Sequence, residues 1–278
     1  MRIARFSAGS DPQYGIVELA VDGGEHPDTV SAVTGDPLAT KVQLTGQRYD
    51  LTDVRLLAPV IPRSKVVAVG RNYAEHAAEL GNEVPETPMT FLKPNTSVIG
   101  PDESIVYPSY TNQLSYEGEL AIVIGRICKE VPAERVPEVI FGYTIANDVT
   151  ARDLQRDHKQ WLLGKSLDTF APMGPWAVTA DEVGDPTALE VSTTVNGEPR
   201  QKAPVSDLIF DIPELIRVIS AGITLLPGDI IATGTPAGVG IGFAPPRFLV
   251  PGDVVECAVT GLGTLRNRIG SGDPDAGR

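Results

Sequence analysis

The sequence contains few of the residues that build disulfide frameworks and zinc sites. Its 278 residues include two cysteines, Cys128 and Cys257, and three histidines. The cysteines lie far apart in apolar runs, so neither a disulfide framework nor a Cys/His zinc spacing is present. We therefore expect a cytoplasmic protein with reduced thiols.

Long apolar runs and positive charge are also scarce. No run approaches the roughly 20 apolar residues of a membrane span, and the first residues lack the apolar core of a secretory signal. Lys+Arg number 23 against 36 Asp+Glu, which gives a formal net charge of −13. Because no Lys/Arg cluster stands out, we expect no binding to nucleic acid or to an anionic membrane.

Three familiar motifs for nucleotide binding and nucleophilic catalysis are absent. Gly164-Lys165-Ser166 is similar to the end of a phosphate-binding loop, but Lys159 occupies the position where that loop needs its first glycine. The chain has no G-x-G-x-x-G pattern between a strand and a helix, and no G-x-S-x-G pattern. A dinucleotide fold and a serine triad are therefore not expected.

Glycine and proline, by contrast, are plentiful and fall between apolar runs. The 28 glycines and 24 prolines predict many short strands and turns, and hence a mainly β (α+β) fold with a few short helices. We expect a small β-rich unit over residues 1–60, a larger domain over residues 61–270 and a frayed tail over residues 271–278. The pairings should be hairpins and mixed contacts, because no regular βαβ units occur.

Some local signals are specific. Asn196-Gly197 between two strand-like runs predicts a two-residue hairpin. Residues 212–221 predict a helix, with Asp211 as its N-cap and Pro213 in the first turn. A second, short helix over residues 73–80 is expected, with Asn72 as its cap.

The strongest chemical signal is a pair of acids on a strand. Glu117 and Glu119 share a face with Ala121 and Val123, because side chains alternate along a strand. Two carboxylates leading into an apolar face repel each other, and a bound cation removes that cost. An isolated pair of this kind is more often a solvated strand end, but a third acid, Asp148, follows the next apolar run. Three carboxylates without Cys or His favour Mg²⁺, Mn²⁺ or Ca²⁺.

A histidine and a glutamate lie three residues apart on the expected short helix. His76 and Glu79 should share a face, and a carboxylate-oriented histidine can act as a general base. A simple surface ion pair is the commoner reason for such spacing.

Together these residues resemble the fumarylacetoacetate hydrolase family. Six motifs occur in the family's order over roughly residues 65–270: Gly70-Arg71-Asn72-Tyr73-x-x-His76-x-x-Glu79, Phe91-Leu92-Lys93-Pro94, Glu117-x-Glu119, Asn147-Asp148-x-Thr150-Ala151-Arg152-Asp153-x-Gln155, Gly164-Lys165-Ser166-x-Asp168 and Thr233-Gly234-Thr235-Pro236-x-Gly238-Val239-Gly240. The resemblance implies a mixed β-roll around a metal, usually in a homodimer. The first 60 residues look like the variable N-terminal unit of bacterial members.

The resemblance also implies roles for individual residues. Glu117, Glu119 and Asp148 match the Mg²⁺ or Mn²⁺ ligands, which agrees with the argument from the three acids. The matched catalytic residues are the His76–Glu79 dyad on a lid and the metal-adjacent Lys165. The matched substrate contacts are Arg71, Tyr73, Lys93, Arg152, Gln155 and Thr235.

One departure bears on the substrate. Fumarylacetoacetase itself has an additional aspartate ligand shortly before its catalytic histidine, and residues 66–76 contain none here. The departure therefore points away from fumarylacetoacetate and toward the smaller bacterial relatives that act on 2-oxo acids. Because both His76 and Glu79 are present, we expect hydrolysis of a C–C bond in an acylpyruvate. Oxaloacetate decarboxylation and dienedioate isomerisation at the same site are the alternatives. A non-enzymatic hypothesis is a metal-binding scaffold, although such a scaffold would not need to keep His76, Glu79 and Lys165.

Overall fold

The computed structural model describes residues 1–9, 11–20 and 27–271. Its main feature is a mixed twelve-stranded sheet with the path β4-β3-β2-β1-β14-β12-β11-β17-β6-β7, to which β5 and β8 are added beside β1 and β14. The strands of this sheet are β1 (Arg2–Ser7), β2 (Gln13–Glu18), β3 (Thr29–Val33), β4 (Leu44–Asp50), β5 (Arg55–Leu57), β6 (Val66–Gly70), β7 (Met89–Lys93), β8 (Val98–Ile99), β11 (Gly118–Ile124), β12 (Ile140–Asn147), β14 (Ala171–Thr179) and β17 (Ile230–Ala232).

Two smaller sheets complete the β structure. A five-stranded sheet consists of β9 (Ser104–Ile105), β15 (Glu190–Val195), β16 (Glu198–Pro204), β18 (Val254–Val259) and β19 (Gly263–Ile269), and a two-stranded ladder joins β10 (Leu114–Ser115) to β13 (Thr150–Ala151). Because β11 contacts β15 and β18, and β12 contacts β18, the five-stranded sheet packs against the middle of the large one.

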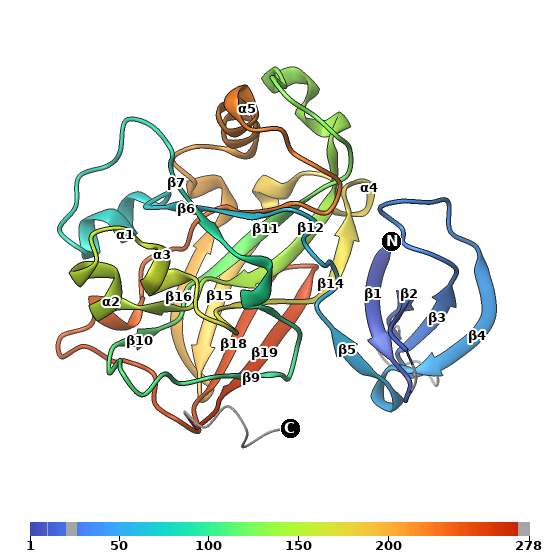
Figure 1. Cartoon of the computed structure of the whole chain (residues 1–278), viewed down its shortest axis with the longest axis horizontal. Coiled ribbons are helices and arrows are strands. Elements are labelled where there is room, and N and C mark those ends of the chain that lie inside the picture. The colour runs from blue at the N-terminus through green and yellow to red at the C-terminus, as the bar shows by residue number, and fades with distance from the viewer. Residues whose placement is uncertain (10, 21–26, 272–278) are drawn as a thin grey trace.

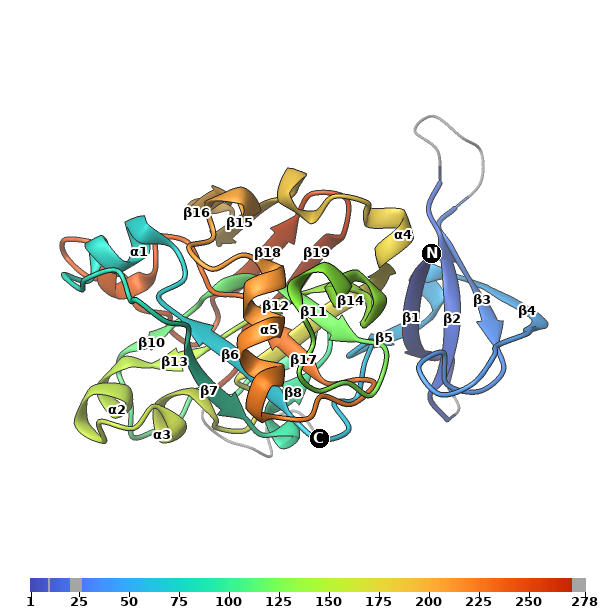
Figure 2. The ribbon, with the colours of Figure 1, turned by 90° about the horizontal axis from the view of Figure 1, so that it is seen from above.

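Helices are short and lie outside these sheets. The α-helices are α1 (Ala74–Glu79), α2 (Arg152–Asp157), α3 (Leu162–Lys165), α4 (Ala180–Val183) and α5 (Ile212–Gly222), and the 3₁₀ turns are η1 (Leu51–Asp53), η2 (Asn95–Ser97), η3 (Ala133–Glu138), η4 (Pro186–Ala188), η5 (Val205–Asp207) and η6 (Gly240–Gly242). Figures 1 and 2 show α5 beside the large sheet and the strands β1–β4 set to one side of the remaining chain. The predicted mainly β fold with few helices is confirmed. Within the described residues no helix is both long and apolar enough to cross a membrane.

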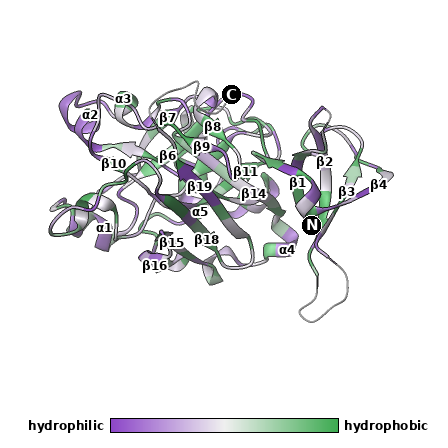
Figure 3. Ribbon diagram, turned by 90° about the horizontal axis from the view of Figure 1, so that it is seen from below, coloured by the Kyte–Doolittle hydropathy of each residue, from purple (hydrophilic) through white to green (hydrophobic). Residues whose placement is uncertain are grey.

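The core explains why β11 lies at the centre. All seven of its residues are buried, and its two faces enter different apolar clusters. Leu120 and Ile122 belong to the larger cluster and Ala121 and Val123 to the smaller one. Figure 3 shows the apolar colouring of central strands such as β11 and β18 against the polar α2. An acid placed at the start of such a strand is carried into the interior.

The first strand connects the N-terminal strands to the large sheet. Arg2 and Ile3 of β1 pair with Val178 and Ala177 of β14 in an antiparallel register. Residues 272–278, most of the predicted tail, lie outside the described residues, as do residues 10 and 21–26.

Two local predictions are confirmed and one is wrong. Asn196 and Gly197, both with positive φ, join β15 to β16 as the hairpin signal predicted. The Asp211 side chain caps α5 by accepting a hydrogen bond from the Glu214 amide at 2.8 Å. Asn72, however, does not cap α1, which begins after Tyr73 without a side-chain cap. The Asn72 amide group bonds instead to backbone atoms of Phe210 and Thr233, because the tertiary fold brings these segments against it.

Candidate active site

Three buried acids meet where β11 begins and β12 ends. These two strands are antiparallel neighbours with Gly118 opposite Asn147, so Asp148 lies beside Glu117, and its amide donates to the Glu117 carbonyl oxygen at 2.8 Å. One carboxylate oxygen each from Glu117, Glu119 and Asp148 lies within 4.8 Å of the others. All three residues are at most 4% exposed. The geometry thus brings together the three acids that the sequence singled out.

Three cationic side chains surround this acid triad. Lys165 Nζ lies 2.6 Å from both Glu117 Oε2 and Asp148 Oδ2. Lys93 Nζ lies 2.5 Å from Asp148 Oδ1, and Arg152 pairs with the second oxygen of Glu117. Within the described part of the chain no lysine or arginine pairs with Glu119, whose Oε2 accepts only the Gly234 amide at 2.8 Å. The negative charge of an ionised Glu119 is therefore the least compensated of the three.

The pKa directions follow from this unequal pairing. Burial raises the pKa of Glu117, but the charges of Arg152 and Lys165 outweigh burial and hold that pKa at about 2. Burial and the charges of Asp148 and Glu117 raise the pKa of Glu119 well above its ordinary value. A divalent cation beside Glu119 would remove this penalty, and three carboxylates are the donors that hard divalent ions prefer. The residues present therefore fit Mg²⁺, Mn²⁺ or Ca²⁺.

A histidine and a glutamate face each other on α1. His76 is 4% exposed, and its Nδ1 lies 3.3 Å from Glu79 Oε2. The other oxygen of Glu79 accepts the Gly238 amide at 2.9 Å, and a Cβ on Gly242 would overlap the Glu79 carboxyl group. A glycine-rich loop over residues 234–242 therefore fixes the carboxylate that orients the imidazole.

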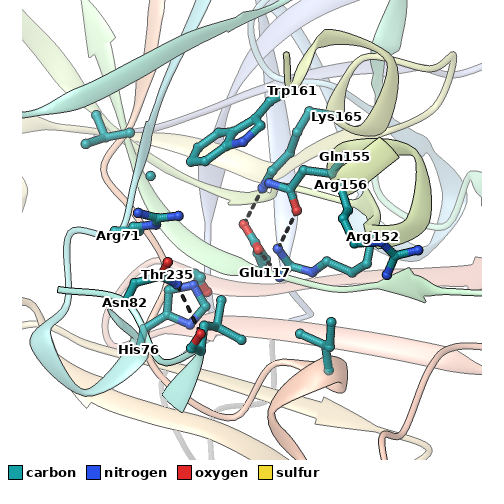
Figure 4. A pocket seen from close by; sticks show the side chains of 14 residues that line it. Arg71, His76, Asn82, Glu117, Arg152, Gln155, Arg156, Trp161, Lys165 and Thr235 are labelled. Carbon is teal, nitrogen blue, oxygen red and sulfur yellow. Dashed lines mark hydrogen bonds and ion pairs between the residues drawn. The ribbon is translucent and has the colours of Figure 1, made fainter. Parts of the chain in front are cut away.

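A pocket of about 280 Å³ is lined by residues of both the acid triad and the His76–Glu79 dyad (Figure 4). Of the predicted site residues, the following line it: Arg71, His76, Glu117, Arg152, Gln155, Lys165 and Thr235. Of the lining residues that the structure describes, Glu117 alone is acidic, whereas four are lysine or arginine. Arg71 makes no ion pair with any described residue. The other three cations each pair with an acid, Arg152 and Lys165 with Glu117 and Arg156 with Asp157.

Two predicted substrate contacts, Lys93 and Tyr73, do not line the pocket. The buried ammonium of Lys93 bonds to Asp148 and to the carbonyl oxygens of Val149 and Lys165, so its donors are already engaged. Burial lowers the pKa of Lys93, while the Asp148 charge opposes that shift. Burial, followed by the Glu119 and Asp207 charges, raises the pKa of Tyr73. The hydrogen bonds of Lys93 favour a role in holding Asp148, whereas the buried Tyr73 hydroxyl has no hydrogen-bond partner among the described residues.

The sequence reading missed Trp161. Its ring lines the pocket, packs against Gly70 so closely that a Cβ there would overlap it, and lies 6.0 Å from the Arg71 guanidinium. Phe91 contacts it edge-on with ring centroids 5.3 Å apart. A lone tryptophan between α2 and α3 has no spacing signal, since only the fold places it against β6 and β7.

Comparison with known proteins places both parts of the chain in described families. Residues 65–270 match the model of the fumarylacetoacetate (FAA) hydrolase C-terminal family, and residues 1–59 match a family described as Rv2993c-like, N-terminal. Protein Rv2993c of Mycobacterium tuberculosis is 47% identical over 272 residues, which cover 97% of this chain and 98% of that protein. Oxaloacetate tautomerase YisK of Bacillus subtilis is 50% identical over 226 residues, which cover 80% of this chain and 75% of that protein.

A solved structure extends the agreement to three dimensions. The 5-carboxymethyl-2-hydroxymuconate delta-isomerase from Mycobacterium smegmatis is 44% identical and superposes with a TM-score of 0.85, covering 98% of this chain and 100% of that one. Its similarity spans the N-terminal strands as well as the pocket. The chain therefore belongs to the fumarylacetoacetate hydrolase family.

Proposed function

We propose that this chain is an enzyme that moves a proton at the carbon beside the carbonyl of a small 2-oxo dicarboxylate, as in the keto–enol interconversion of oxaloacetate. The observation that carries the proposal is the pocket lined by both His76, which Glu79 contacts, and the Lys165–Glu117 pair. The relatives named tautomerase and isomerase catalyse proton shifts of this kind.

Glu117, Glu119 and Asp148 would hold Mg²⁺ or Mn²⁺ in this proposal. When bound, the ion would supply Lewis-acid polarisation of the substrate's 2-oxo group. The remaining chemistry belongs to side chains of the chain itself.

The dyad supplies the base. Glu79 Oε2 holds the proton on His76 Nδ1, which leaves Nε2 as the atom that accepts a proton from the substrate carbon. Lys165 uses two of its three ammonium hydrogens on Glu117 and Asp148, and the third is available to the developing enolate oxygen. Arg71, with no carboxylate partner among the described residues, is the candidate for the substrate's second carboxylate.

C–C hydrolysis of an acylpyruvate is the second candidate. The oriented His76–Glu79 pair supports it, because the same Nε2 can deprotonate a water molecule. Decarboxylation of oxaloacetate needs no such base, and for that reason we rank it below both. We further propose that the chain works as a homodimer, which light scattering of the purified protein would test.

Proton NMR of the purified protein with Mg²⁺, in parallel with EDTA controls, separates these reactions. EDTA-sensitive acceleration of enol loss from oxaloacetate would support the tautomerase. Acetate plus pyruvate from acetylpyruvate would support the hydrolase instead. Pyruvate from oxaloacetate above the metal-only background, with no enol effect and no acetylpyruvate cleavage, would indicate a decarboxylase. Absence of all three activities would leave the non-catalytic scaffold.

A further inference from the structure

We propose that Gln201 is a positioning residue that holds the acid triad and the His76–Glu79 dyad in register. Gln201 belongs to β16 of the five-stranded sheet and is 3% exposed. Its side chain does not line the pocket, and the sequence motifs gave no reason to single it out. It acts through its neighbours rather than on substrate.

One end of the Gln201 amide group fixes the strand that carries two of the acids. Its Oε1 accepts the Gly118 amide at 3.0 Å, and Gly118 lies between Glu117 and Glu119. A Cβ on Gly118 would overlap Thr193 Oγ1, so β11 lies tightly against the five-stranded sheet here. Gln201 therefore sets the height of the Glu117–Glu119 backbone over that sheet.

The other end fixes the glycine-rich loop. Gln201 Nε2 donates to Thr235 Oγ1 at 2.7 Å and to the Pro236 carbonyl oxygen at 2.8 Å. Thr235 Oγ1 in turn donates to the Gly118 carbonyl oxygen at 3.0 Å. One side chain thus ties the loop to the acid-bearing strand in a closed set of buried hydrogen bonds.

The same loop provides backbone amides that bind one acid of the triad and the glutamate of the His76–Glu79 dyad. The Gly234 amide donates to Glu119, and the Gly238 amide donates to Glu79. Loss of the Gln201 amide would leave the Gly118 N–H and the Pro236 carbonyl oxygen unpaired in the interior, which favours a shift of the loop. Such a shift would move Glu119 and Glu79 together. Residues that orient metal ligands typically change metal affinity or activity by about 10–100-fold when altered.

Gln201→Met tests this, because methionine has a similar length but cannot make these hydrogen bonds. The matched control is Asn267→Leu. Asn267 is also a buried amide in the five-stranded sheet and donates to two carbonyl oxygens, those of Gly100 and Glu103. For each protein we would measure the Mn²⁺ dissociation constant by calorimetry, the melting temperature with EDTA, and kcat and KM for oxaloacetate at saturating Mn²⁺.

We expect Gln201→Met to weaken Mn²⁺ binding about 10-fold or more and to lower kcat at saturating metal. Asn267→Leu should lower the melting temperature while leaving the Mn²⁺ dissociation constant and kcat within about twofold of wild type. Equal Mn²⁺ affinity and kcat in Gln201→Met and wild type would overturn the proposal and leave Gln201 a packing residue.

A second variant covers the case in which Gln201→Met does not fold. Gln201→Asn keeps the amide but is one methylene shorter, so it cannot span from Gly118 to Pro236, and the same losses are expected. The kcat arm rests on the proposed function, whereas the Mn²⁺ arm does not. If wild type binds Mn²⁺ but leaves oxaloacetate unchanged, the proposed reaction fails, and the affinity comparison still decides the role of Gln201.

Discussion

At the residue scale, the site is governed by how buried charges are shared. Glu117 and Asp148 each have cationic partners, whereas Glu119 has the Gly234 amide. A buried carboxylate without a cation destabilises the native state when it is ionised. Ionised Glu119 is therefore the acid that destabilises the metal-free protein most, and we expect a bound metal ion to stabilise it most.

Glu119→Gln should separate metal binding from folding. We expect Mn²⁺ affinity to fall at least about 100-fold, because a ligand carboxylate is lost. The metal-free variant should unfold at the same temperature as wild type or a higher one, since a neutral amide replaces a carboxyl group whose ionisation is opposed by burial and by two neighbouring acids. Calorimetric Mn²⁺ titration and thermal unfolding in EDTA measure the two effects. Exposed Glu138→Gln is the control, and a Glu119 variant with intact affinity would remove Glu119 from the ligand set.

Metal affinity should depend on pH in a defined direction. Burial and the Asp148 and Glu117 charges raise the pKa of Glu119, so in the metal-free protein this carboxyl group holds a proton to higher pH than an ordinary glutamate does, and Mn²⁺ competes with that proton. Mn²⁺ affinity should therefore rise as pH rises toward that raised pKa and weaken as pH falls. Titrations between about pH 6 and about pH 8 in buffers of different ionisation enthalpy would measure the released proton. If Mn²⁺ competes only with the proton on Glu119, Mn²⁺ binding to Glu119→Gln should release no proton.

His76→Asn should remove catalysis and keep the metal. Asparagine can still bond to Glu79 but cannot accept a proton, so kcat should fall by about 10²–10⁴-fold. Mn²⁺ affinity should stay near wild type, because His76 is not one of the three acids. The exposed His158→Asn is the matched control. Wild-type turnover by His76→Asn would refute the dyad assignment.

At the element scale, α1 depends on the loop over residues 234–242. The helix has six residues and no side-chain cap, so little within it fixes its position. Its last residue, Glu79, is fixed from outside by the Gly238 amide and by close contact with Gly242. The position of the catalytic histidine is therefore set by another segment of the chain.

Gly242→Ala should disturb this docking. The added methyl group would overlap the Glu79 carboxyl group, and we expect kcat to fall by about 10–100-fold, since small misplacements of catalytic groups have effects of this order. Mn²⁺ affinity should be unaffected, because Gly242 does not contact the triad. Gly222→Ala, at the open end of α5, is the control with no neighbour to displace. Equal kcat in both variants would show that α1 does not need the loop.

At the scale of the whole molecule, net charge opposes the approach of the proposed dianionic substrate. The chain carries −13 overall, while the pocket is lined by lysine and arginine side chains. Long-range repulsion and short-range attraction therefore act on an approaching dianion together, and salt screens the first more than the second.

Raising the ionic strength should consequently improve substrate capture. Between about 0.01 M and about 0.15 M salt the Debye length shortens from about 30 Å to about 8 Å, which removes most of the repulsion from distant acids. We expect kcat/KM for oxaloacetate to increase and kcat to stay constant, as steady-state kinetics at fixed free Mg²⁺ can measure. A fall in kcat/KM would mean that the pocket cations dominate the field at long range.

Features that rest on local chemistry could be predicted from the order of the residues alone. The Asn196-Gly197 hairpin and the Asp211 cap follow from backbone preferences of neighbouring residues. The proximity of Asp148 to Glu117 and Glu119 could also be anticipated, because two successive apolar runs were expected to form strands, with acids at the start of one and the end of the other. Ordered motifs then pointed to the family.

The side chains that support the site could not be predicted in this way, because they come together through long-range packing. Asn72 bonds to residues up to 161 positions away, Gln201 contacts Gly118 across 83 positions, and Lys93 contacts Asp148 across 55. No periodicity or propensity relates residues so far apart, because their contacts depend on how whole sheets and loops pack. The three acids could be predicted from the sequence, whereas the residues that hold them in place could be identified only from the packing of the sheets.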